Sequence, residues 1–353
     1  MVVVLGIDVH KGSHTAVAVD EAGRKLGERT VRATDAGHLQ LLAWAAREFG
    51  TAGSGVRFAV EDCRHVSGRL ERALLAAGQA VVRVPPKMMA ATRASARTRG
   101  KSDPIDALAV ARAALREPGL PAATHDTVSR QVKLLTDHRE DLVQIRTQLQ
   151  NRLRWHLHDL DPELETAPRG LSRLAELDRL AGWLGQQPES VTARIAAELV
   201  DDIRGLTVRA ARLERELTAQ MALIAPRLLA LPGCGALTAA KIIGETANAG
   251  RFRSEACYAM HAGVAPIPAS SGRSTRHRLA RGGNRQLNAA LHRIAVTQIR
   301  LEGPGRAYFQ RRITMGNSKM EALRALKRRL ARIVFNLLRS TPGTQTPGLP
   351  AAA

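Results

Sequence analysis

The order of β-rich and helical segments in the first 84 residues is the strongest constraint on what this chain can fold into. Along the chain the segments are 2–8, 14–20, 25–32, 37–49 (helical spacing), 56–61, 67–77 (helical spacing) and 79–84. Two strands joined by a short turn, a third strand, and then helix–strand–helix–strand is the order of a ribonuclease-H-like domain. We therefore predict an α/β domain over residues 1–120.

Four acidic residues stand at the ends of these elements. Asp8 ends the first strand and Glu61 ends the fourth, so we expect both carboxylates at a sheet end and outside the core. Asp103 and Asp106 open a helix, and Pro104 disfavours helical geometry at the residue before it, which predicts Asp103 as the N-cap. One turn apart, the two aspartates can face one point, with β-carbons about 5–6 Å apart.

Converging carboxylates repel one another unless cations neutralise them. Two Mg²⁺ ions roughly 4 Å apart would do this and would also hold the attacking and leaving oxygens of a phosphodiester. In the alternative interpretation Asp8 is a turn residue, while Asp103 and Asp106 only cap a helix and compensate its dipole. Spacing leaves both interpretations open.

The chain is strongly basic, with 53 Lys and Arg against 32 Asp and Glu and a net charge of +21. A field of that sign favours a polyanionic partner, and nucleic acid fits better than an anionic membrane. Before Asp103, six basic residues follow one another with no acid between them: Arg83, Lys87, Arg93, Arg97, Arg99 and Lys101. This run predicts a phosphate backbone lying across the acids; a solvated basic helix face is the alternative.

Two further features predict a cytoplasmic protein that has no membrane partner. No apolar stretch approaches the length of a membrane span, and the first residues lack the basic flank and cleavage site of a secretory signal. The three cysteines, Cys63, Cys234 and Cys257, are odd in number and have no metal-type spacing, so neither a disulfide framework nor a zinc site is expected.

Residues 121–228 form a predicted helical middle domain. We expect two long helices in this domain. The second carries apolar residues spaced alternately by three and four, which is typical of a coiled-coil seam: Ile203, Leu206, Ala210, Leu213, Leu217, Met221 and Ile224. A helical hairpin within one chain and a contact between subunits both fit this seam.

Residues 229–340 are predicted to form a mainly helical domain, and 341–353, rich in Pro, Gly, Thr and Ala, a disordered tail. The stretch 229–245 indicates helix, tight turn, helix, similar to a helix-hairpin-helix motif, in which the amides of Gly233 and Gly235 point at a phosphate. An ordinary turn between packed helices fits equally well.

Ser271 stands at the mouth of a basic region. Between Glu255 and Glu302 there is no acid, while arginines accumulate: Arg273, Arg276, Arg278, Arg281, Arg285, Arg293 and Arg300. A serine hydroxyl attacks phosphorus only where the developing charges are stabilised, and clustered guanidiniums supply this. On these residues alone, a serine-glycine loop beside a basic nucleic-acid surface is the favoured interpretation.

Two sets of motifs together resemble a known family, the DEDD-type transposases of the "one hundred and ten" family of insertion sequences, which includes the Piv-like DNA invertases. The first set is Gly-Ile-Asp8-Val-His-Lys11, Val-Glu61 and Lys101-Ser-Asp103-Pro-Ile-Asp106. The second set is Leu-Pro-Gly-Cys-Gly, Gly263-x-x-Pro266, Ser271-Gly272 and Arg281-Gly-Gly-Asn284-Arg-Gln-Leu287. The match covers both ends of the chain in the right order.

The resemblance implies a RuvC-like first domain, a coiled-coil middle and a C-terminal transposase domain. It implies that Asp8, Glu61, Asp103 and Asp106 bind Mg²⁺ and that Ser271 forms a 5′-phosphoserine link to DNA. It further implies donor and target DNA, a structured guide RNA, a dimer or tetramer with composite active sites, and a nucleoid-associated location. The residues expected to contact nucleic acid are Lys11, Arg93, Arg97, Arg99, Lys101, Gly233, Gly235, Arg273, Arg276, Arg278, Arg281, Asn284 and Arg285.

The sequence departs from the family pattern at three points. Ser270 adjoins Ser271, which leaves the nucleophile ambiguous by one residue, and Asp62 adjoins Glu61, although strand alternation lets only one of them face the site. Where the family has a lysine before the Gly-Asn pair, this chain has Arg278 and Arg281. Two other functions fit the residues: a metal-dependent nuclease or resolvase with a C-terminal DNA clamp, and a non-catalytic nucleic-acid-binding protein.

Overall fold

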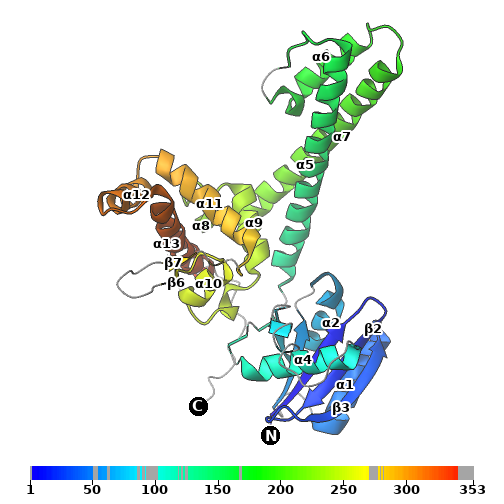
Figure 1. The fold of residues 1–353 in the computed structure, drawn as a ribbon, viewed down its shortest axis with the longest axis vertical. Helices are drawn as coiled ribbons and strands as arrows, with labels where there is room; N and C mark the ends of the chain where they lie inside the picture. The colour runs from blue at the N-terminus through cyan, green and yellow to red at the C-terminus, as the bar shows by residue number, and fades with distance from the viewer. Residues whose placement is uncertain are drawn as a thin grey trace. The chain divides into compact units, whose positions relative to one another are not determined.

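The structure is a computed structural model, and its chain forms two compact units, residues 1–125 and 126–353 (Figure 1). It describes residues 2–50, 55–61, 64–85, 88–89, 92, 102–117, 119–120, 122–123, 126–166, 169–269, 277–278, 280 and 282–340. Among these, no helix is long and apolar enough to cross a membrane.

The first unit is built on a five-stranded sheet. Its strands are β1 (Val3–Val9), β2 (Ser13–Val19), β3 (Lys25–Arg32), β4 (Val56–Glu61) and β5 (Ala80–Val84), and their order across the sheet is β3-β2-β1-β4-β5. The pairs β1–β2 and β2–β3 are antiparallel, whereas β4 runs parallel to β1 and β5 runs parallel to β4. This topology confirms the predicted ribonuclease-H-like arrangement.

Helices cover both faces of the sheet. On one face, Leu41 and Trp44 of α1 (Asp35–Phe49) and Leu70 of α2 (Arg64–Ala76) are buried in one core with alternate residues of β1. On the other face, the alanines of α4 (Asp103–Arg116) pack against the strands, and Ala107 of this helix lies against β1. The alternation along β1 divides its side chains between the two cores, and this layering brings the start of α4 to the sheet.

The second unit begins with two long helices, α5 (Thr127–Leu160) and α7 (Val191–Ile224), drawn in green in Figure 1. The predicted seam packs within the chain: Ile203 shares a core with Leu153 of α5, and Leu217 shares another with Val132. The segment between these helices forms the short elements η1 (Gly170–Ser172) and α6 (Leu174–Leu184).

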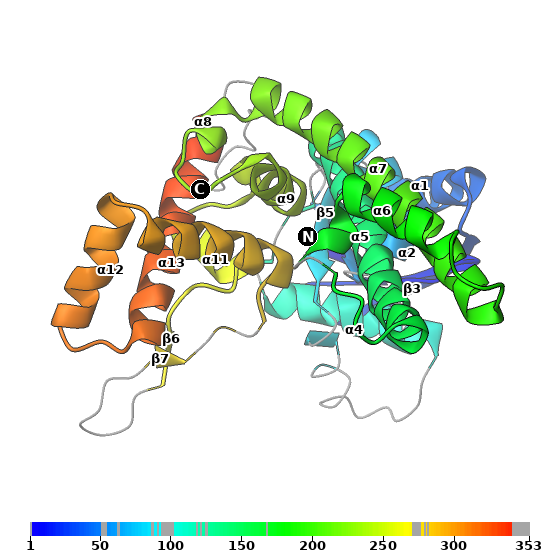
Figure 2. The ribbon, with the colours of Figure 1, turned by 90° about the horizontal axis from the view of Figure 1, so that it is seen from above.

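The remaining helices enclose a core around the fully buried Tyr258. In chain order the elements are α8 (Pro226–Leu229), α9 (Ala236–Thr246), η2 (Ala249–Arg251), α10 (Glu255–His261), β6 (Ile267–Pro268), β7 (His277–Arg278), α11 (Arg285–Arg300), α12 (Pro304–Thr314) and α13 (Lys319–Arg339). Figure 2 shows α11, α12 and α13 side by side, with the β6–β7 pair beside α13. Val132 of α5 and Met221 of α7 belong to the same core, so the long helices and the C-terminal helices form one unit.

Candidate active site

Two predicted acids meet at the ends of neighbouring parallel strands. The register pairs Ile7 of β1 with Val60 of β4, so the next residues along the two strands, Asp8 and Glu61, are neighbours at the carboxyl end of both. Paired residues of adjacent strands project to the same face of a sheet. Gly6 and Asp8 share a face because they are two residues apart, and Gly6 faces α4.

Gly6 allows α4 to approach this edge closely. A β-carbon at Gly6 would lie 2.2 Å from the carbonyl oxygen of Ala107 and 2.3 Å from the amide nitrogen of Ala111, both backbone atoms of α4. No side chain larger than hydrogen therefore fits between strand and helix. The first turn of α4, with Asp103 and Asp106, is held next to the end of β1 as a result.

The helix starts one residue earlier than the sequence predicted. Ser102 is the N-cap, and Asp103 is the first helical residue with Pro104 after it, so the expected N-cap role of Asp103 is wrong. The Ser102 side chain makes no capping hydrogen bond. Both aspartates of this first turn lie near the positive end of the helix dipole, where acidic side chains stabilise a helix.

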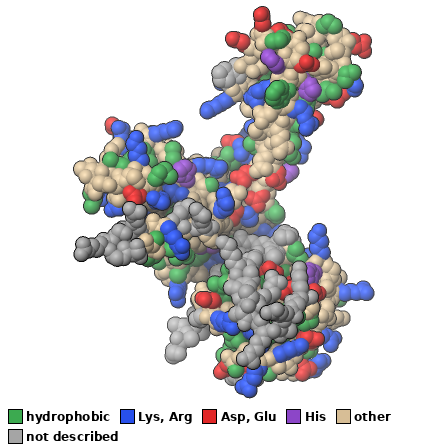
Figure 3. Space-filling view, viewed as in Figure 1, with side chains coloured by type: hydrophobic (Ala, Val, Ile, Leu, Met, Phe, Trp, Pro, Cys, Tyr) green, Lys and Arg blue, Asp and Glu red, His purple; other side chains and the backbone are tan. Residues whose placement is uncertain are grey.

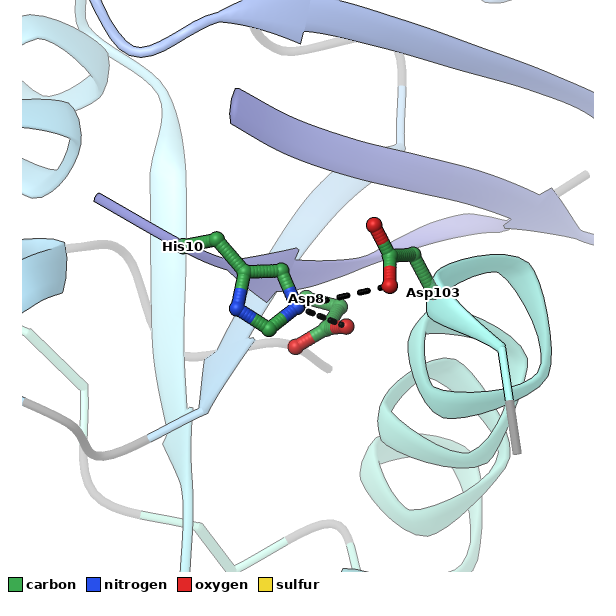
Figure 4. A group of neighbouring side chains, drawn as sticks. All are labelled: Asp8, His10 and Asp103. Atoms are coloured by element: carbon green, nitrogen blue, oxygen red, sulfur yellow. Dashed lines mark hydrogen bonds and ion pairs between the residues drawn. The ribbon is translucent and has the colours of Figure 1, made fainter. Parts of the chain in front are cut away.

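Asp8, His10 and Asp103 form a cluster whose ligand atoms all lie within 4.8 Å of one another (Figure 4). The His10 Nε2 atom is 3.1 Å from Asp8 Oδ2 and 3.5 Å from Asp103 Oδ1, so the imidazole bridges two carboxylates that come from different elements. Side chains from β1, from the residue after β1 and from α4 thus point toward one another.

Asp8 is buried, with 4% of its surface exposed, and not outside the core as its position near the strand end suggested. The cover that α4 provides explains the difference. Burial raises the pKa of the Asp8 carboxyl; nearby His10 lowers that pKa, while Asp106, Asp103 and Glu61 each raise it. The three other predicted acids therefore lie close enough to Asp8 to act on its carboxyl.

This donor set fits a divalent cation. Carboxylate oxygens are the ligands that Mg²⁺ prefers, and a buried carboxyl among three other acids gains most from a neighbouring positive charge. Asp8 and Asp103 offer oxygens close enough to share one ion, since both belong to the 4.8 Å group. Asp106, 7% exposed, and the half-buried Glu61 lie near enough to Asp8 to affect its pKa.

His10 was not among the predicted site residues. The signal that indicates it is the Asp8-x-His10 spacing, because residues two apart near a strand end project in the same direction. The side chain of His10 is 53% exposed, so it stands at the open side of the cluster while Asp8 lies beneath.

Several predicted residues lie outside the described parts of the chain. These are Ser271 with its neighbour Ser270, Asp62, Arg93, Arg97, Arg99, Lys101, Arg273, Arg276 and Arg281. Three predicted nucleic-acid contacts are exposed on the surface: Lys11 follows β1, Arg278 lies on β7, and Arg285 begins α11. Their exposure is what a contact with a phosphate backbone requires.

The two glycines of the predicted hairpin have different surroundings. Gly233 has a positive φ of 83°, and a β-carbon there would lie 3.1 Å from the carbonyl oxygen of Ile294 in α11. Close packing therefore explains this glycine. Gly235 is the N-cap of α9, and no atom of the described residues lies within 4 Å of its β-carbon position, which leaves room for a ligand there.

Asn284, predicted to contact nucleic acid, uses its side chain inside the protein instead. Its oxygen accepts a hydrogen bond from the amide of Leu287 and so caps α11, and its Nδ2 donates to Glu245 at 2.6 Å. Glu245, 4% exposed, also pairs with Lys133 of α5. The Gly-Gly-Asn motif thus anchors α11 to α9 and α5, a structural role that separations of 39 and 112 residues hid from the sequence.

Comparisons with known proteins agree with the geometry. A profile of DEDD-type IS110 transposases, described as "Transposase", matches residues 5–162, and a second, described as "Transposase IS116/IS110/IS902 family", matches residues 225–310. The chain belongs to this transposase family. As a transposase it is a DNA-cleaving and DNA-recombining enzyme, and its DEDD class implies dependence on a divalent metal; the structure contains an acidic group, Asp8 and Asp103 with His10, of the kind that holds such an ion.

The transposase resembles its relatives over nearly its whole length. It is 29% identical to the "Insertion element IS116 uncharacterized 44.8 kDa protein" of Streptomyces clavuligerus, with 97% of this chain and 98% of that protein covered. It is 26% identical to the "Insertion element IS900 uncharacterized 42 kDa protein" of Mycobacterium paratuberculosis, with 95% of each covered. A "Probable family 20 transposase" of Pseudomonas aeruginosa is 30% identical, with 50% of this chain and 52% of that protein covered.

Solved structures give a weaker likeness. The structure of Thermus thermophilus RuvC is 19% identical, covering 34% of the transposase and 99% of RuvC, with a TM-score of 0.27. Its complex with a Holliday junction substrate has the same TM-score at 17% identity, with 35% of this chain and 100% of that chain covered. The fold assignment rests on the strand order of the sheet and not on these scores.

Proposed function

We propose that this transposase cleaves and exchanges DNA strands with Ser271 as the nucleophile and with Asp8, Glu61, Asp103 and Asp106 as the ligands of two Mg²⁺ ions. The observation that carries the proposal is the buried Asp8 carboxyl, on whose pKa the three other acids act. Bound Mg²⁺ would neutralise these acids and polarise a phosphodiester oxygen. The DEDD family match over residues 5–162 supports the same assignment.

The protein's own residues prepare this site in three ways. Gly6 sets the distance between β1 and α4, and hence between Asp8 and Asp103. The α4 dipole stabilises the carboxylates of its first turn. His10 bridges Asp8 and Asp103 and orients their oxygens toward each other. These features hold Asp8 and Asp103 close together before DNA binds, which lowers the cost of ordering these two metal ligands during the reaction.

In the proposed covalent step, the Ser271 hydroxyl loses its proton and its Oγ attacks a DNA phosphorus. The Oγ–P bond forms, the P–O3′ bond breaks, and the leaving 3′ oxygen takes up a proton. The product is a 5′-phosphoserine and a free 3′ hydroxyl, and a 3′ hydroxyl from another strand then reverses the step to join new partners. Arg278 and Arg285 follow Ser271 along the chain and are both exposed, so they are suited to stabilise the phosphate charge.

We further propose that donor and target DNA are paired through a structured guide RNA bound by a homo-oligomer, a dimer or tetramer with composite sites. The net charge of +21 supports a nucleic-acid partner, and Lys and Arg side chains are spread over the face of both units seen in Figure 3. Large apolar side chains exposed on α5 and α7 support contact with a second copy: Leu134, Ile145, Val208 and Leu223, exposed by 54%, 45%, 49% and 83%.

The test is the covalent protein–DNA species, detected on a denaturing gel after incubation with donor DNA and Mg²⁺. We expect Ser271→Ala to abolish the species and Ser270→Ala, its matched neighbour, to retain it. Glu61→Gln should abolish it, whereas Glu28→Gln, the same change on exposed β3 of the same sheet, should not. If Ser271→Ala still cuts DNA in a metal-dependent reaction, the transposase acts as a metal nuclease and the serine assignment is wrong.

A further inference from the structure

The second unit contains a basic pocket of about 480 Å³ between the β6–β7 pair, α12 and α13. Figure 2 shows how these elements are arranged in the fold. Its charged lining is five cations and one acid: Arg278, Arg312, Arg324, Lys327, Arg328 and Glu321. The volume is within the range of pockets that bind small ligands, and the excess of positive charge indicates an anionic one.

Lys327 is the most unusual of these residues because only 8% of its surface is exposed. Its Nζ donates to Asn288 Oδ1. The Asn288 side chain is fixed in this orientation, since its Nδ2 donates to the carbonyl oxygens of Ala262 at 3.1 Å and Gly263 at 2.9 Å. Within the described chain no carboxylate forms an ion pair with Lys327, and burial lowers the pKa of its ammonium group. A buried ammonium without a counter-charge is costly.

Each acid near the pocket already has partners, and Glu255 neutralises one of the five pocket cations, Arg328. Glu321 closes the capping box of α13, where its carboxylate accepts hydrogen bonds from the backbone and side chain of Ser318. Glu255 pairs with Arg328 at 3.3 Å and also with Arg332. Among the described residues, the buried Nε of Arg312 has no hydrogen-bond partner. The pocket thus retains a net positive charge and donors that are ready for an acceptor.

We propose that this pocket binds a backbone phosphate of a DNA strand, with Lys327 as its buried anchor and Arg324 and Arg312 as further donors. Phosphate oxygens accept charge-assisted hydrogen bonds from ammonium and guanidinium groups, and they supply the counter-charge that Lys327 lacks. The choice of DNA rests on the proposed function: Ser271 belongs to the segment that joins β6 to β7, and β7 lines this pocket.

The first experiment measures melting temperature with and without inorganic phosphate at constant ionic strength. For the unliganded protein we expect Lys327→Met to raise the melting temperature, because it removes a buried charge, and to lose the upward shift that phosphate gives the wild type. Lys319→Met is the matched control, since Lys319 is exposed on the same helix and does not line the pocket. A lowered melting temperature together with an unchanged phosphate response would show that Lys327 is only structural and would overturn the proposal.

The second experiment measures the affinity for duplex DNA and for RNA of equal length over a range of salt concentrations. We expect Lys327→Met to weaken DNA binding about tenfold and to reduce the salt slope by about one phosphate, with no change in Lys319→Met. Loss of RNA binding alone would overturn the assignment to DNA. Because neither readout requires cleavage, a failure of Ser271 as nucleophile would leave both results unaffected.

Discussion

The close approach of α4 to β1 makes Gly6→Ala the sharpest test of how the acidic site is built. The new β-carbon would lie 2.2 Å and 2.3 Å from backbone atoms of α4, so the helix must move by about 1 Å to relieve the overlap. Overpacking against backbone costs about 3 kcal/mol. At roughly 4 °C per kcal/mol for a unit of this size, the melting temperature of the first unit should fall by roughly 12 °C.

The same displacement moves Asp103 and Asp106 away from Asp8, and a misplacement of about 1 Å in a catalytic site costs about a hundredfold in rate. We expect Gly6→Ala to lower metal-dependent DNA cleavage by that factor at a temperature where the protein remains folded. Thermal unfolding by circular dichroism and a cleavage time course measure the two effects. Gly12→Ala is the matched control, because nothing lies within 4 Å of its β-carbon position. Wild-type melting and cleavage in Gly6→Ala would refute this reasoning.

Three further predictions concern buried polar groups. Burial lowers the pKa of His14 to about 4, so unfolding takes up a proton below pH 6.5. The free energy of unfolding should therefore fall by roughly 3 kcal/mol as the pH drops from 6.5 toward 4. Urea unfolding measured at a series of pH values should show a smaller fall in His14→Phe than in the wild type. Glu245→Ala leaves Lys133 and Asn284 without their buried partner and should cost about 3 kcal/mol in urea unfolding; an unchanged midpoint would contradict the anchoring role. Because the pKa of Asp8 is raised, protons should begin to compete with Mg²⁺ for this carboxyl at a higher pH than at an ordinary aspartate. Calorimetric titration with Mg²⁺ at a series of pH values should show this loss of Mg²⁺ affinity in the wild type and not in Asp8→Asn.

Local patterns were sufficient to predict the framework of the first unit. The strands at 25–32 and 56–61 match β3 and β4 to the residue, because each is a β-rich run with clear turn signals at its ends. Strand alternation and order then indicated which acids share one edge of the sheet. The neighbouring positions of Asp8 and Glu61 and the influence of Asp103 and Asp106 on the Asp8 carboxyl follow from that topology.

What sequence reasoning missed depends on contacts between distant segments. The burial of Asp8 requires α4 to lie against Gly6, a contact across 101 residues from Gly6 to Ala107. The contacts of Glu245 with Asn284 and with Lys133 join three helical segments, and no local pattern encodes them. In the sequence Lys327 is one of many cations in a basic helix, and only the packing of α13 shows that its side chain is buried.

Recombination of a donor and a target plasmid, with the guide RNA supplied, tests the central claim most directly. We expect Asp8→Asn and Ser271→Ala both to fail to recombine the plasmids while binding nucleic acid with wild-type affinity. Recombination by Ser271→Ala, with failure of Asp8→Asn alone, would contradict the claim of a combined serine and metal site.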